Sequence, residues 1–141
     1  MKHIDEQFEN IVVQSTCQLF EAEGFALKHK GSTGQLTFPA GTRAVAGLLG
    51  FAGTEMRGTV VLASPLSFAE LAHPAANENA GPSEASLRDW AGEATNMLLG
   101  RIKNQLLRHT VEIYMATPNT VCGDNICIPS LREHPTDWQV F

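Results

Sequence analysis

The chain has 141 residues and a formal charge of −5, with 43% hydrophobic and 18% charged residues. This length fits one domain, and this composition excludes a disordered chain. The acidic balance, without any run of Lys and Arg, argues against general binding to nucleic acid or to anionic membranes.

Two further features bear on location. The longest apolar stretch, residues 44–53, is too short to span a membrane and contains three glycines. The first ten residues are acidic, whereas a signal peptide begins with basic residues and continues with an apolar run. We therefore expect a cytoplasmic protein with no membrane association and with reduced cysteines.

The N-terminal region predicts one amphipathic helix. Hydrophobic residues recur at three- and four-residue steps from Ile4 to Phe20, which is typical of a helix with one buried stripe. Acidic residues near its start suit the positive end of the helix dipole, and Gly24 is a suitable stop. Glycines and Pro39 then interrupt the pattern, leaving room for one short strand at residues 35–38.

The middle of the chain predicts a covered β-hairpin. Residues 43–65 are typical of two strands joined through GTEMRG (53–58). Their small apolar side chains favour a sheet that is covered on at least one face. A short helix at 67–73 and a polar loop at 73–85 follow, before a long helix.

The last part of the chain predicts two more strands, at residues 111–116 and 121–128. The segment DWQVF (137–141) alternates like the start of another strand. Two interpretations of this segment stay open: a short edge strand, or a strand that is incomplete at Phe141.

Three cysteines raise the question of a metal site. Cys122 and Cys127 lie close together and His134 follows, but a second pair of ligands at matching spacing is missing. The histidines form no HxxxH or HExxH motif. Buried structural cysteine is the commoner situation, and we expect no metal and no cofactor on this chain.

The long helix, residues 86–106, has two faces that follow from a rotation of about 100° per residue. With Asp89 at zero, Glu93 lies at about +40°, Asn96 at about −20° and Gly100 at about +20°. The apolar residues gather around the opposite pole and predict the buried face: Leu87, Ala91, Ala94, Leu98 and Ile102. A stripe of Asp, Glu, Asn and Gly therefore faces solvent.

Two members of this stripe are unexpected in a helix. Asn96 is a mediocre helix former, and an interior glycine such as Gly100 costs about 1 kcal/mol relative to Ala. A glycine on an exposed face has a physical use where the backbone of another molecule approaches closely. This pattern indicates a docking surface.

The residues beside them allow two interpretations each. Asp89 either contacts a partner or forms a capping box with Ser86 at the helix start. Trp90 and Met97 border the stripe, where they are either buried against a neighbouring element or available to a docking partner.

This motif resembles the signature of the CheC/CheX/FliY family of chemotaxis phosphatases, in which an acidic or Ser residue, Glu, Asn and Gly follow one another on one helix with gaps of three, two and three residues. Here it reads DWAGEATNMLLG, residues 89–100, with every fixed position filled. The segments GTVVLASP (58–65) and TPNTVCGDN (117–125) are similar to the family in order and character. A single motif copy favours the CheX branch over CheC, whose members usually carry two.

The resemblance implies an α+β fold: a mixed, largely antiparallel sheet with long helices packed on it, in a single CheX-like domain over residues 1–141. It implies a phosphatase for the aspartyl-phosphate of a CheY-like response regulator, in chemotaxis or another two-component pathway. Asn96 would orient the attacking water and Glu93 would engage the regulator's lysine, while Mg²⁺ is expected on the regulator. The other partner-binding residues would be Asp89, Trp90, Met97 and Gly100.

Two functions stay open: this phosphatase, or a non-catalytic CheX-like module that docks a receiver domain or signalling partner. The Glu93–Asn96 pair favours the enzyme, because a docking module would have little use for that amide. We also expect a homodimer formed through the sheet. CheX-like proteins pair in this way, and the strands within residues 43–64 are apolar enough to need cover.

Overall fold

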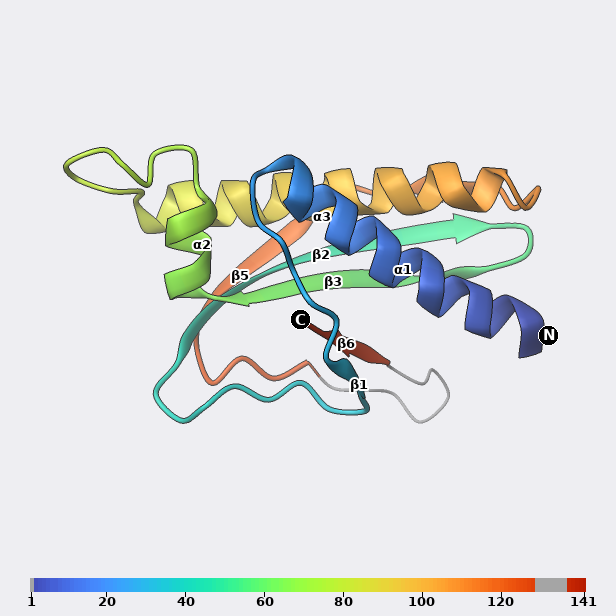
Figure 1. Cartoon of the computed structure of the whole chain (residues 1–141), viewed down its shortest axis with the longest axis horizontal. Helices are drawn as coiled ribbons and strands as arrows, with labels where there is room; N and C mark the ends of the chain where they lie inside the picture. Colours follow the sequence, from blue (N-terminus) through green and yellow to red (C-terminus); the bar gives the residue numbers. More distant parts are fainter. Residues whose placement is uncertain (1, 129–136) are drawn as a thin grey trace.

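The computed structural model describes residues 2–128 and 137–141, in which helices pack on an antiparallel sheet (Figure 1). In chain order the elements are α1 (Lys2–Ala22), β1 (Gly31–Thr33), β2 (Arg43–Gly53), β3 (Arg57–Pro65), α2 (Leu66–Ala72), α3 (Glu84–Leu107), β4 (Ile113–Met115), β5 (Asn119–Asp124) and β6 (Trp138–Val140). The predicted α+β fold is confirmed. None of the helices described combines the length and the hydropathy that a bilayer crossing requires.

The larger sheet is built around β2. The hairpin predicted from the sequence is present: β3 pairs antiparallel with β2, and Val45 lies opposite Ser64. On the other edge of β2, β5 pairs with its first half and β4 with its last three residues, again antiparallel. Because β2 is the central strand and α3 packs on one face of it, most of its small apolar side chains are buried.

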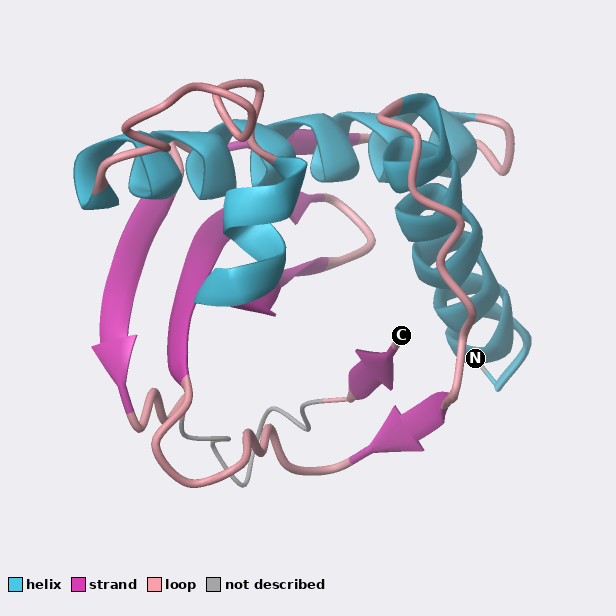
Figure 2. Ribbon diagram, turned by 60° about the vertical axis from the view of Figure 1, so that its left-hand side comes forward, coloured by secondary structure: helices cyan, strands magenta, loops and turns pink. Residues whose placement is uncertain are grey.

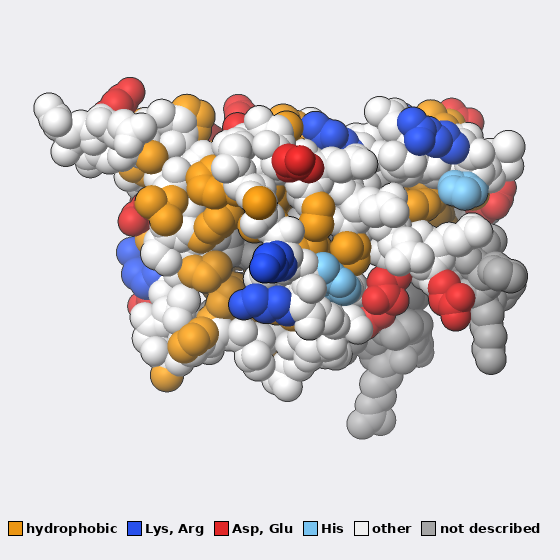
Figure 3. Space-filling view, in the orientation of Figure 1, with side chains coloured by type: hydrophobic (Ala, Val, Ile, Leu, Met, Phe, Trp, Pro, Cys, Tyr) orange, Lys and Arg blue, Asp and Glu red, His pale blue; other side chains and the backbone are white. Residues whose placement is uncertain are grey.

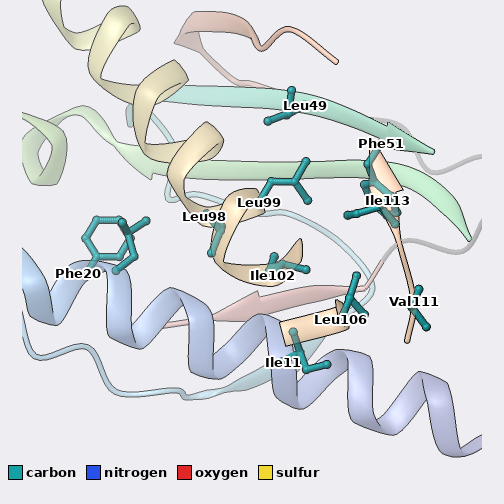
Figure 4. Packing of buried hydrophobic residues seen from close by; sticks show 11 residues of the cluster. Ile11, Phe20, Leu49, Phe51, Leu98, Leu99, Ile102, Leu106, Val111 and Ile113 are labelled. Atoms are coloured by element: carbon teal, nitrogen blue, oxygen red, sulfur yellow. The ribbon is translucent and has the colours of Figure 1, made fainter. Parts of the chain in front are cut away.

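The core lies between the sheet and the helices (Figure 4). Leu99 and Ile102 of α3 meet Leu49 of β2 and Ile113 of β4, and all four are fully buried. Each such side chain contributes about 1.5–3 kcal/mol relative to exposure. Figure 2 shows α3 lying along the sheet, with α1 beside it and α2 near the start of α3.

The first predicted helix is confirmed, and the chain leaves it through Gly24, whose φ of 90° is accessible to glycine. The strand predicted at residues 35–38 is wrong. The strand lies earlier, at β1, where Ser32 faces Gln139 of β6. A short strand is stable only where its backbone groups find partners, and β6 supplies them to residues 31–33.

The bounds of the C-terminal strands are also set by the strands with which they pair. The strand predicted at 121–128 begins at Asn119 and ends at Asp124, because Asp124 faces Arg43, the first residue of β2. Asn125 then turns the chain with a φ of 52°. Within residues 137–141, β6 is a short strand that pairs with β1 in a separate two-stranded sheet.

Candidate functional site

α3 presents the predicted stripe to solvent. The side chains of Asp89, Glu93 and Asn96 are exposed and Gly100 is partly exposed, while the five predicted inner positions are all buried. Among the described residues, the side-chain hydrogen bonds and ion pairs of α3 engage other positions of the helix. The two carboxylates and the amide of the stripe therefore remain available to a second molecule.

The capping box predicted from Ser86 and Asp89 is wrong. The helix begins one turn earlier, and its N-cap is Ser83, whose hydroxyl oxygen accepts a hydrogen bond from Ser86 N at 3.2 Å. Glu84 occupies the first turn, where a carboxylate suits the helix dipole. Asp89 is thus inside the helix, which removes the structural role that competed with a partner contact.

Two glycines hold α3 close to the sheet. A Cβ on Gly47 of β2 would lie 2.7 Å from Ala91 O and would collide with the Thr95 side chain. A Cβ on Gly92 of α3 would lie 3.2 Å from the Thr120 methyl carbon of β5. Thr95 uses its hydroxyl within the helix, donating to Ala91 O at 2.6 Å. These contacts fix the orientation of the exposed stripe.

Gly100 differs from Gly47 and Gly92, which lie in close contact between α3 and the sheet. A Cβ built on it meets no described heavy atom within 4 Å. The fold of this chain therefore does not require glycine at this position, although glycine weakens the helix.

Trp90 is packed against a neighbouring element, whereas Met97 is exposed at the border of the stripe. Trp90 is partly buried, and its ring lies 6.5 Å from that of Phe20 on α1. Met97 is 45% exposed. Both side chains line a pocket of about 240 Å³ beside the stripe, between α3 and the C-terminal ends of α1 and α2.

The pocket includes residues that the sequence analysis missed, such as Glu23 from the end of α1 and His73 from the end of α2. No spacing in the sequence connects these positions to residues 89–97. Only the packing of three helices brings them together.

Among the residues that the structure describes, the cysteines do not form a cluster with other metal-binding side chains. Cys122 is partly buried near Val45, and Cys127 is exposed. Within residues 2–128 and 137–141, no group of three His, Cys, Asp or Glu residues is placed to hold a metal ion. His134, the third candidate, lies outside the described residues.

A family model described as "Chemotaxis phosphatase CheX" matches residues 45–137, a range that contains the whole motif of residues 89–100. The chain belongs to the CheX family. This confirms the family and the branch predicted from the sequence. A search of curated proteins found no match.

Solved structures agree with this assignment. CheX from Vibrio vulnificus is 25% identical, with a TM-score of 0.79 over 93% of this chain and 87% of that one. A CheC-like superfamily protein from Shewanella sp. PV-4 is also 25% identical, with a TM-score of 0.72 over 86% and 80% of the two chains. CheX from Borrelia burgdorferi, solved as a complex with CheY, BeF3 and Mg²⁺, shares the fold at 12% identity, with a TM-score of 0.60 over 84% and 78%.

Proposed function

We propose that this chain hydrolyses the aspartyl-phosphate of a CheY-like receiver domain, with Asn96 and Glu93 as its working residues. The observation that carries the proposal is the pair itself. The Asn96 amide and the Glu93 carboxylate lie one helical turn apart on α3, whose opposite face is buried. Both side chains are exposed, and neither makes a side-chain hydrogen bond or ion pair with another described residue.

Asn96 suits the positioning of water. Hydrolysis needs a water molecule in line with the scissile P–O bond, and positioning supplies most of the catalysis in phosphoryl transfer. A side-chain amide can donate to one group and accept from the water, as the water-orienting glutamine of small GTPases does. The amide is not a general base, so the proton of the water passes to the phosphoryl oxygens or to solvent.

Glu93 suits the recognition of a cation. A carboxylate on this face forms a charge-assisted hydrogen bond with the lysine beside the receiver's phosphorylation site and so sets the register of docking. Asp89, Met97 and Trp90 extend the contact, and Gly100 permits the receiver's backbone to approach. The divalent cation belongs to the receiver, and no cofactor on this chain takes part.

Two further facts support this proposal. The family that matches is described as a phosphatase, and the Borrelia burgdorferi relative was solved with CheY, beryllium fluoride and Mg²⁺.

The experiment measures the decay of phosphorylated receiver domains from the same genome, with and without this protein. We expect Asn96→Ala to abolish the acceleration while binding persists and stability changes by at most about 0.5 kcal/mol, as for other exposed positions. Asn104→Ala, a second exposed asparagine on α3, is the matched control and should hydrolyse like wild type. Hydrolysis by Asn96→Ala at the wild-type rate would refute the role of Asn96, whereas binding of the receiver by wild type without faster decay would leave the non-catalytic docking module.

We also propose a homodimer formed through the sheet. Gly47 faces α3, so Ala46 and Leu48 face the other way, where Ala46 is already buried within the chain and Leu48 is partly exposed. On this face Leu48 lies opposite Val61 of β3, and Ala46 lies opposite Val121 of β5, whose side chain is 42% exposed. This apolar face lies on the opposite side of the sheet from α3, so pairing through it leaves the stripe of each protomer accessible.

A further inference from the structure

The pocket beside the stripe has the composition of a site for one large side chain. Its volume of about 240 Å³ is below the roughly 300–1,000 Å³ typical of pockets for drug-sized ligands. Its base is apolar: Leu19 and Phe20 of α1 and Ala94 of α3 are buried, and the Trp90 ring stands beside them. Figure 3 shows hydrophobic side chains gathered between α2 and the C-terminal end of α1.

The rim of the pocket is acidic. Glu23, in the turn after α1, and Asp89 and Glu93 of α3 line it, all three exposed, and no Lys or Arg among the described residues does so. His73 adds an imidazole whose Nδ1 accepts a hydrogen bond from Ala75 N at 2.9 Å. An apolar base with aromatic rings and a carboxylate rim is complementary to a side chain that has a hydrocarbon stem and a cationic end.

The pocket is continuous with the surface assigned to docking. Asp89, Glu93 and Met97 belong to both, whereas Asn96 and Gly100 do not line the pocket. On the helix, the pocket residues lie on the Glu93 side of the stripe, because Trp90 and Met97 are rotated by about 80–100° from Asp89. A receiver seated over Asn96 therefore covers the mouth of the pocket with a neighbouring part of its surface.

We propose that this pocket receives a Lys or Arg side chain of the receiver domain, distinct from the lysine that Glu93 engages. The inference rests on the proposed function. The stem packs on Phe20 and Trp90, and the cationic end lies between Glu23 and Asp89. The pocket thus selects receivers that carry a basic residue at this second position, and it acts on affinity rather than on the chemical step.

The test reverses the charge of Glu23, which lines the pocket on the side opposite the stripe of α3. Glu23→Lys should weaken binding of a receiver charged with beryllium fluoride and Mg²⁺ by about tenfold at low salt, because like charges then face each other. Its turnover at saturating phosphorylated receiver should equal that of wild type. Glu21→Lys is the matched control: it makes the same charge change two residues earlier, at an exposed position that does not line the pocket, and should bind like wild type.

A second variant fills the space without changing charge. Ala72→Phe places a ring in the pocket from α2 and should weaken binding in the same way. Replacing the receiver's surface Lys and Arg residues one at a time by Ala identifies the occupant: at one position, the loss of affinity should shrink in the Glu23→Lys background.

The outcomes separate the two proposals. If Glu23→Lys and Ala72→Phe both bind like the Glu21→Lys control while wild type still hydrolyses, the pocket proposal is wrong and the proposed function stands. A fall in turnover without a change in affinity also overturns it, since the pocket would then act on chemistry. If wild type neither binds nor dephosphorylates any receiver of the same genome, both proposals fail together.

Discussion

Replacement of Gly100 separates stability from function. A Cβ at this position meets no described atom within 4 Å, so Gly100→Ala gains helix propensity with no opposing clash. The expected gain is about 1 kcal/mol, which for a chain of this size raises Tm by about 3 °C. Gly100→Leu should be stabilised by a similar amount but should lose receiver binding, because its side chain projects beside Asn96 and Glu93. Thermal unfolding and receiver dephosphorylation, measured on the same samples, test both parts.

Gly92 provides the matched control, since it is also interior to α3. There a Cβ would lie 3.2 Å from the Thr120 methyl carbon, so the contact with β5 offsets the propensity gain. We expect Gly92→Ala to be no more stable than wild type. If Gly100→Ala fails to raise Tm, the chain itself needs the glycine. If Gly100→Leu dephosphorylates the receiver normally, no partner backbone approaches this position.

Three further predictions concern docking, packing and assembly. Glu93→Ala should weaken binding of the activated receiver by about tenfold in calorimetry, and unchanged affinity would refute its pairing with lysine. Gly47→Ala should destabilise the protein by about 1–3 kcal/mol in urea unfolding, because the Cβ is forced against Ala91 O at 2.7 Å; a neutral result would show that α3 can move off the sheet at no cost. Sedimentation equilibrium should give about twice the chain mass of 15.3 kDa, while the mass of one chain would reject the dimer.

Local patterns were sufficient for much of the fold. The two faces of α3 follow from the helical periodicity of 3.6 residues, and the β2–β3 hairpin from two apolar runs joined through a turn-forming segment. The stripe of Asp89, Glu93, Asn96 and Gly100 was predicted for the same reason, because residues three and four apart share a face of any helix. These features involve neighbours in sequence, so the sequence alone determined them.

Other features depend on partners that are distant in the chain. Residues 31–33 form a strand because residues 138–140 pair with them, which no local pattern at 35–38 could reveal. Gly92 and Gly100 look alike in the sequence, and only the position of Thr120 makes one a packing residue and leaves the other open. The pocket next to the stripe draws on α1, α2 and α3. Such contacts are decided by how the elements pack, since burial and hydrogen bonding join residues by their distance in space rather than in sequence.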